Sequence, residues 1–397
     1  MRSLPAIEGG QPVRREMLPY GQQWIEDDDI EAVSNVLKSS FLTTGPKIAE
    51  FEALFAKYVG AKYAVAVANG TAALHAAVFA AGINPGDEVI TSPVTFVASA
   101  NCILYQGGTA VFADVGTSDR NIDPVEVSKK VTQQTKAVIP VHFTGMPVDL
   151  REIHEIAKSH NLTVIEDAAH ALGATYQGEK IGGLSHMTIF SFHPVKNITT
   201  GEGGMVTTND QRFYKRLTTF RTHGITREKT ELSENHGPWY YEMNCLGYNY
   251  RLTDVQAALG ISQLAKIDRF LQRRKEIAGR YMEAFSGMIE LSVPEEKPDR
   301  ESGWHLYVIR LNTQALRVGR RQVFEALRGE NIGVNVHYIP VYLHPYYRSL
   351  GYSAGLCPEA ERLYSEIISL PLFPKMRDRD VDDVISAVRK VVTYYRK

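Results

Sequence analysis

Residues 191–206 of the chain read SFHPVKNITTGEGGMV. They follow residues 186–190 (HMTIF), an apolar run that is typical of a buried strand. Lys196 therefore stands in a Pro- and Gly-rich turn at the end of a core strand. A single lysine on such a turn is usually a solvated surface residue, so a chemical role for Lys196 has to be supported by the rest of the chain.

The segments before this turn alternate between short apolar runs and helical patterns. Strands are predicted at residues 61–69, 87–93, 109–115, 136–145 and 162–169, and helices between them at residues 70–82, 95–107 and 150–161. This alternation predicts an α/β fold with a mostly parallel sheet that helices cover on both faces. In such sheets ligands bind at the carboxyl ends of the strands, so the candidate functional residues are those that directly follow a strand.

The composition of the 397-residue chain restricts its class. The 44 basic and 45 acidic residues nearly cancel, which does not favour a nucleic-acid or membrane-surface partner. No apolar run approaches the ~18 residues of a membrane span, and the first residues lack the apolar core of a signal peptide. The separated Cys102, Cys245 and Cys357 fit neither a zinc site nor a disulfide framework. We therefore expect a cytoplasmic globular protein without a metal site.

The length predicts more than one domain. Residues 1–25 lack periodicity and are expected to form an N-terminal arm, residues 26–265 a large domain and residues 266–397 a small C-terminal domain. The boundary is placed within a long helical pattern over residues 249–285. The small domain is expected to be α/β, with strands at residues 304–311 and 333–342 and helices at residues 320–331 and from Val381 onward.

Three groups of polar or aromatic residues directly follow predicted strands. Gly70 and Thr71 begin a helix, where they could bind a phosphate group or only cap the helix. Phe96 follows the next strand and could form the wall of a site or part of the core. Asp167 ends another strand, with His170 three residues later. A carboxylate in that position needs a positive partner unless it lies on a surface turn.

Taken together with Lys196, these residues supply an amine, a carboxylate, an aromatic plate and a phosphate site. Pyridoxal 5′-phosphate (PLP) requires this set, because its aldehyde binds a lysine and its ring nitrogen pairs with a carboxylate. The lysine must be neutral to attack a carbonyl, and desolvation at the end of a strand favours the neutral form. The residues therefore predict a PLP site built around Lys196.

Six motifs in order resemble one protein family: GTAAL, TFVASAN, EDAAHALGA, SFHPVK, GEGG and YNYRLTDVQAALG. The chain is similar to the DegT/DnrJ/EryC1/StrS family of PLP-dependent nucleotide-sugar aminotransferases, a branch of fold type I. The resemblance extends from residues 9–14 (GGQPVR) to residues 369–374 (SLPLFP). It implies a large PLP-binding domain with a mostly parallel sheet, followed by a smaller α/β domain.

The resemblance also implies roles for individual residues. Lys196 would bind the PLP aldehyde, Asp167 the pyridinium nitrogen and Phe96 the face of the ring. His170 would lie beside the ring oxygen, although many family members have glutamine there, which leaves this role open. The phosphate group would be held by Gly70, Thr71, Ser191 and, from the neighbouring subunit of a homodimer, Asn249. The sugar-nucleotide pocket would be lined by Tyr20, Phe41, Leu42, Thr43, His337 and Tyr338.

The predicted reaction comes from the same resemblance. Residues 92–102, 191–204, 222–243 and 336–342 favour a transaminase that moves an amino group from L-glutamate to C4 of a UDP-4-keto-6-deoxy-N-acetylhexosamine. The product would be UDP-4-amino-4,6-dideoxy-N-acetyl-β-L-altrosamine, an intermediate of pseudaminic acid biosynthesis. The family's dehydratases have histidine in place of the lysine, so Lys196 argues against that branch.

Several alternatives remain open at the level of the sequence. The substrate could be a GDP- or dTDP-linked keto sugar, or the amine could be placed at C3. A PLP-binding regulator without turnover and a lyase that acts on amino acids alone are further alternatives, although the chain has no DNA-binding segment. His193 and Glu202 lie close enough to Lys196 to belong to the site or to be structural.

Overall fold

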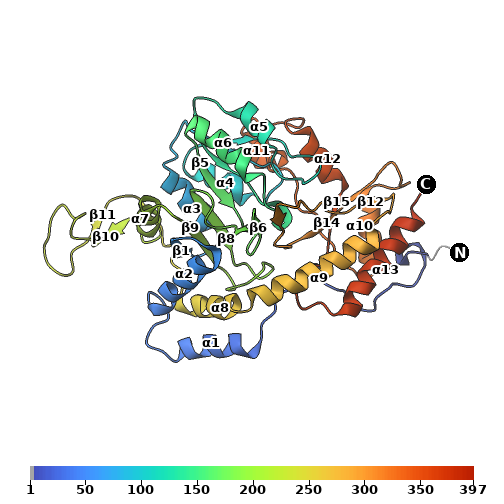
Figure 1. Ribbon diagram of the computed structural model, residues 1–397, viewed down its shortest axis with the longest axis horizontal. Helices are drawn as coiled ribbons and strands as arrows, with labels where there is room; N and C mark the ends of the chain where they lie inside the picture. Colours follow the sequence, from blue (N-terminus) through green and yellow to red (C-terminus); the bar gives the residue numbers. More distant parts are fainter. Residues whose placement is uncertain (1–3) are drawn as a thin grey trace.

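The computed structural model describes residues 4–397 (Figure 1). Its centre is a seven-stranded sheet in the order β1-β9-β8-β5-β4-β2-β3, in which only β9 runs antiparallel to its neighbours. The strands are β1 (Tyr63–Val67), β2 (Glu88–Thr91), β3 (Thr109–Phe112), β4 (Thr135–Ile139), β5 (Thr163–Asp167), β8 (Met187–Ser191) and β9 (Gly204–Thr208). The predicted α/β fold with a mostly parallel sheet is confirmed.

Helices cover both faces of this sheet. Successive residues of a strand point to opposite faces, so each strand contributes side chains to two buried clusters. In β1, Val65 and Val67 belong to one buried cluster, with residues of α3, α4 and α7, whereas Ala64 and Ala66 belong to a second, with residues of α2, α6 and α8. The helices of this part of the chain are α1 (Asp27–Leu37), α2 (Pro46–Val59), α3 (Gly70–Ala81), α4 (Ala98–Tyr105), α5 (Pro124–Lys130), α6 (Leu150–His160), α7 (Gln211–Phe220) and α8 (Asp254–Leu264).

A third buried cluster lies in the C-terminal part, between a small antiparallel sheet and three helices. The sheet has the order β12-β14-β15, with β12 at Leu291–Ser292, β14 at Tyr307–Leu311 and β15 at Ile367–Leu370. The helices are α9 (Ile267–Phe285), α10 (Arg320–Gly329) and α13 (Asp378–Tyr394). The arm and the C-terminal end of the chain are in contact, since the hydroxyl of Tyr395 donates to Glu8 Oε1 at 2.7 Å; α13 leads to this C-terminal end (Figure 1).

The remaining elements are short. They are η1 (Ala6–Glu8), η2 (Phe143–Gly145), η3 (Val341–Leu343), α11 (Pro345–Ser349), α12 (Pro358–Glu366), β6 (Thr175–Tyr176), β7 (Glu179–Lys180), β13 (Arg300–Glu301), β10 (Ile225–Thr226) and β11 (Glu242–Met243). The last two form a hairpin that projects from the side of the molecule (Figure 1). None of the helices between residues 4 and 397 is both long and apolar enough to cross a lipid bilayer.

Two details of the predicted C-terminal half are wrong. The helical pattern over residues 249–285 forms two helices, α8 and α9, which are separated at Ala265 and Lys266. Residues 333–342 do not form a strand. Only Asn335 makes a bridge there, to Ser369 of β15, and Pro340 has no N–H group for a ladder. The partners of β14 are β12 and β15.

The division at residues 25 and 265 stays a prediction. Two contacts bear on the arm. Leu18 bridges Ile332, and the buried Glu330 accepts hydrogen bonds from the N–H groups of Ala6 and Val13, each at 2.8 Å. The described part of the arm therefore packs on the C-terminal part of the chain.

Candidate active site

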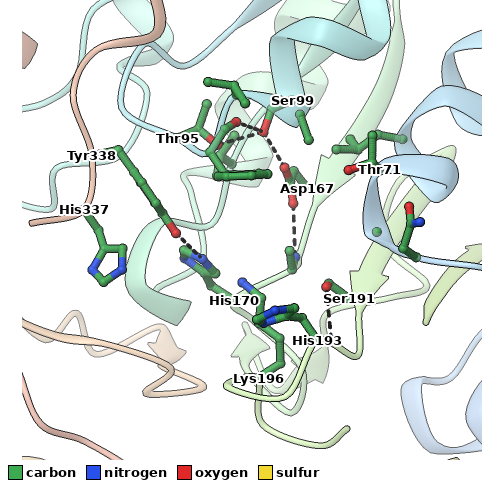
Figure 2. Close-up of a pocket in the computed structure, with 18 of the residues that line it drawn as sticks. Thr71, Thr95, Ser99, Asp167, His170, Ser191, His193, Lys196, His337 and Tyr338 are labelled. Carbon is green, nitrogen blue, oxygen red and sulfur yellow. Dashed lines mark hydrogen bonds between the residues drawn. The ribbon is translucent and has the colours of Figure 1, made fainter. Parts of the chain in front are cut away.

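A cavity of ≈ 980 Å³ opens at the carboxyl ends of the parallel strands. It is enclosed by ends of elements that lie far apart in sequence, since Asp167 ends β5, Ser191 ends β8 and Gly70 begins α3. The structure brings ten predicted site residues to this cavity, namely Tyr20, Gly70, Thr71, Phe96, Asp167, His170, Ser191, Lys196, His337 and Tyr338. Seven of them, all but Tyr20, Gly70 and Phe96, are labelled in Figure 2.

Lys196 extends its amine into this cavity from a tight turn (Figure 2). The N–H of Lys196 donates to the carbonyl of His193 at 2.9 Å, and the side chain of the next residue, Asn197, donates to the carbonyls of Leu172 and Gly303, each at 2.9 Å. Burial lowers the pKa of the Lys196 amine to about 8, against the opposing effect of the Asp167 carboxylate. A substantial share of the amines is therefore neutral slightly above neutral pH.

Asp167 is buried, and one hydroxyl and one backbone N–H hold its carboxylate. Its Oδ2 accepts from Ser99 Oγ at 2.6 Å, and its Oδ1 accepts from the N–H of Ala169 at 3.1 Å. The hydroxyl of Thr95 lies 2.7 Å from Ser99 Oγ. Because Ser99 donates to the carboxylate, Thr95 is the donor of that second bond. The chain Thr95–Ser99–Asp167 orients the carboxylate and leaves it capacity for one further donor in the cavity.

The start of α3 forms the polar end of the cavity beside Ser191. Asn69 caps the helix, since its Oδ1 accepts from the N–H of Ala72 at 2.8 Å. A Cβ atom at Gly70 would lie 2.9 Å from Ser191 Cβ and 3.1 Å from Ser191 Oγ, so glycine is what permits this close approach. The first N–H groups of a helix have no intrahelical acceptor and lie at its positive end, which suits a phosphate group.

Two buried histidines lie next to the amine. His170 Nε2 is 3.2 Å from the hydroxyl of Tyr338, while its Nδ1 is buried without a partner among the described residues. The ring of His305 lies 4.4 Å from that of His170, centroid to centroid. Burial, and secondarily the charge of Lys196, holds the pKa of both histidines well below the usual value, so both are neutral.

Some lining residues were missed by the sequence analysis. Thr95, three residues before α4, and Ser99, in the first turn of α4, lie on the cavity wall. Their spacing of four residues at the start of the predicted helix over residues 95–107 was a usable signal. His305 and Asn335 also line the cavity but gave no such signal, because both were assigned to predicted strands, at residues 304–311 and 333–342.

The roles of several other candidate residues remain predictions. His193 and Glu202, for which a structural role was equally open, both line the cavity. Phe96 is 58 % exposed at its wall. Four predicted residues are exposed and do not line the cavity, namely Phe41, Leu42, Thr43 and Asn249. Asn249 was expected to act in the neighbouring subunit, and its exposure is compatible with that role.

The residues of the cavity fit PLP. Lys196 offers an amine of lowered pKa for the aldehyde, and Asp167 offers a buried, oriented carboxylate for the ring nitrogen. The start of α3 and Ser191 form a cradle that a Cβ at position 70 would fill. Each group that the cofactor requires is therefore present on the wall of one cavity.

Comparisons with known proteins agree with this chemistry. The model of the DegT/DnrJ/EryC1/StrS aminotransferase family matches residues 23–389. The spore coat polysaccharide biosynthesis protein SpsC of Bacillus subtilis is 46% identical over 381 residues, which are 96% of this chain and 98% of SpsC.

Solved structures are similar over almost the whole chain as well. PseC of Helicobacter pylori, an aminotransferase involved in the biosynthesis of pseudoaminic acid, superposes with a TM-score of 0.89 at 32% identity over 96% of this chain and 100% of PseC. The putative sugar aminotransferase Spr1654 of Streptococcus pneumoniae is known in PLP and PMP forms. Its PLP form has a TM-score of 0.89 at 31% identity over 96% of this chain and 100% of Spr1654. The predicted cofactor is thereby confirmed, and the chain belongs to the DegT/DnrJ/EryC1/StrS aminotransferase family, whose aminotransferases are PLP-dependent.

Proposed function

We propose that the protein transfers the amino group of L-glutamate to C4 of a UDP-4-keto-6-deoxy-N-acetylhexosamine, which gives UDP-4-amino-4,6-dideoxy-N-acetyl-β-L-altrosamine. The observation that carries the aminotransferase activity is the convergence of Lys196, Asp167 and the start of α3 on one cavity. The similarity to PseC over the whole chain supports the choice of sugar.

Each half of the reaction needs a base, and Lys196 is the residue placed to supply it. Bound PLP acts as an electron sink that makes the α-hydrogen of the amino donor acidic. The Lys196 amine takes that proton during donation and returns a proton to C4 of the sugar in the second half-reaction. Asp167, oriented by Ser99, keeps the ring nitrogen protonated. L-glutamate leaves as 2-oxoglutarate before the keto sugar enters, so the two substrates use the same cavity in turn.

The sugar is proposed to bind between Tyr20, His337 and Tyr338, which form one wall of the cavity. The rings of Tyr20 and His337 are 5.5 Å apart, and those of His337 and Tyr338 are 4.8 Å apart. Such a wall offers flat apolar faces to the C–H groups of a pyranose together with polar edges to its hydroxyls. We propose further that residues 41–43 contact the nucleotide and that the protein is a homodimer in which Asn249 reaches the partner's phosphate site.

A second candidate is transfer to a different nucleotide-linked keto sugar. The observation that favours it is the similarity to SpsC, a protein of spore coat polysaccharide biosynthesis that is more nearly identical to this chain than PseC is. The cofactor residues would be the same, and only the sugar pocket would differ. A regulator without turnover is disfavoured because the Lys196 amine and the Asp167 carboxylate both lie at the cavity.

The test begins with the purified protein loaded with PLP. Borohydride reduction and peptide mass spectrometry should find the cofactor on Lys196, and L-glutamate should convert the PLP form to the PMP form with release of 2-oxoglutarate. Lys196→Ala should lose both signals, whereas Lys57→Ala, at an exposed position of α2, should keep them. A reduced cofactor found elsewhere, or turnover by Lys196→Ala, would refute the assignment.

The acceptor is tested in a separate assay. The PMP form is offered UDP-, GDP- and dTDP-linked 4-keto sugars, and NMR of the product shows whether C3 or C4 carries the new amine. Turnover with the UDP-linked N-acetylhexosamine supports the first candidate, and turnover with another nucleotide alone supports the second.

A further inference from the structure

His337 in the cavity wall is connected to two polar residues outside the predicted site. Its Nδ1 lies 2.8 Å from Ser369 Oγ, and its Nε2 lies 3.4 Å from Asn335 Nδ2. Ser369 is fully buried in β15, whereas Asn335 lines the cavity. The backbones of Ser369 and Asn335 are paired by two hydrogen bonds of 2.8 and 3.2 Å. The two partners of the imidazole are therefore fixed relative to each other.

The orientation of the Asn335 amide determines where the imidazole carries its proton. Asn335 Oδ1 accepts from the N–H of Val336 at 2.8 Å, and a backbone N–H can only donate. The amide oxygen is thus committed to Val336, and the NH₂ group faces His337 Nε2. Nε2 must then be the acceptor, so the proton lies on Nδ1 and is donated to Ser369 Oγ.

The surroundings of His337 keep this imidazole neutral. Burial lowers the pKa of His337 to about 4, and the cation of Lys196 acts in the same direction. The rings that face it belong to Tyr20 and Tyr338, and no carboxylate among residues 4–397 makes a hydrogen bond to it. His337, which lines the cavity, therefore has one lone pair, on Nε2, which Asn335 engages only at 3.4 Å.

We propose that Ser369 is a positioning residue for the sugar half-reaction, because it holds His337 in the tautomer whose Nε2 accepts a hydrogen bond from a hydroxyl or amide N–H of the sugar. This inference rests on the proposed sugar substrate. The carboxylates of L-glutamate are hydrogen-bond acceptors, so they cannot form a hydrogen bond with an unprotonated Nε2. The effect of Ser369 is therefore confined to the sugar half of the reaction.

Kinetics of Ser369→Ala test the positioning role. Removing the acceptor of the Nδ1 proton allows the ring to turn or to change tautomer, so KM for the keto sugar should rise about tenfold, the worth of one hydrogen bond. The rate of PMP formation from L-glutamate should not change. Ser365→Ala, on the exposed side of α12, is the matched control, and Ser369→Thr, which keeps the hydroxyl, should restore KM. An unchanged KM, or an equal loss in both half-reactions, would overturn the proposal.

Nitrogen NMR of the protein without substrate gives an independent readout. The ¹⁵N shifts of His337, assigned by their loss in His337→Gln, should show a protonated Nδ1 and a bare Nε2, without titration above about pH 5. In Ser369→Ala the share of the other tautomer should increase. A protonated Nε2 in the unmodified protein would refute the inference. If no keto sugar is turned over while the NMR result holds, the proposed function fails and the tautomer assignment does not.

Discussion

At the scale of single residues, burial of Lys196 disfavours the charged form of its amine and so lowers its pKa. An ordinary lysine titrates near 10.5, whereas burial lowers the pKa of Lys196 to about 8. At pH 8 about half of these amines should be neutral, compared with about three in a thousand for an exposed lysine. The rate at which an amine reagent modifies Lys196 in the cofactor-free protein, followed by peptide mass spectrometry, should therefore level off above about pH 8, with exposed Lys57 as the internal standard.

The variant Asp167→Asn tests how the neighbouring carboxylate affects the pKa of Lys196. The Asp167 carboxylate favours the charged amine, so its removal should move the inflection of Lys196 below that of the unmodified protein. An inflection near 10.5 in the unmodified protein, or a move to higher pH in the variant, would contradict the electrostatic description of the site.

Gly70 carries the second prediction at this scale. A methyl group there would overlap Ser191, whose Cβ lies only 2.9 Å from the new atom. Either Ser191 or the start of α3 must shift, at a typical cost of about 1–3 kcal/mol. Gly70→Ala should therefore weaken PLP binding about tenfold or more in an equilibrium titration. Gly279→Ala is the matched control, since a Cβ at that position of α9 meets nothing within 4 Å. Equal PLP affinity in both variants would exclude the cradle.

At the scale of elements, one carboxylate joins two helices. Asp254 belongs to the first turn of α8, yet its oxygens accept from the N–H groups of Gly45 and Lys47, at 2.7 and 2.8 Å, at the start of α2. Asp254 N in turn donates to the carbonyl of Leu42 at 3.0 Å. The buried side chain thus caps a second helix and anchors the loop that was predicted to contact the nucleotide.

Asp254→Asn tests this capping. The amide oxygen can accept only one of the two N–H groups well, and the charge that favours both helix starts is lost. The free energy of unfolding should fall by about 1–2 kcal/mol in denaturant titrations. Asp382→Asn breaks an exposed ion pair with Arg280 and should change it by less than about 0.5 kcal/mol. A variant at position 254 as stable as this control would show that the cap does not contribute.

The strands and their pairing show which parts of the fold could be predicted from the sequence and which could not. Apolar runs of four to five residues between helices identified the parallel strands, because strands buried on both faces need no polar alternation. Residues 333–342 have a similar apolar pattern but pair with β15 at Asn335 alone, and Pro340 has no N–H group to continue a ladder. Pairing partners are set by tertiary structure, and the same reason hid the contact between His337 and Ser369, which are 32 positions apart.

At the scale of the whole molecule, the proposed homodimer would complete the site of each chain. Asn249 is exposed and outside the cavity of its own chain. Large apolar side chains of the preceding residues in the sequence are exposed as well, including Trp239 at 73 % and Leu246 at 75 %. A second copy that covers this surface would bury them and bring Asn249 to the partner's phosphate site, as expected for a homodimer.

Mixed dimers test whether the sites are shared. Two differently tagged chains, one with Lys196→Ala and one with Asn249→Ala, are co-expressed and the mixed dimer is isolated on both tags. Each single variant should be inactive or nearly so as a homodimer. In a shared arrangement the mixed dimer has one complete site, which combines Lys196 of one chain with Asn249 of the other, so about half of the wild-type activity should return. If Asn249 serves its own chain, neither site is complete and activity stays low. Placing both substitutions in one chain, opposite a wild-type partner, reverses the two outcomes, because the shared arrangement then leaves no complete site and the unshared one leaves one.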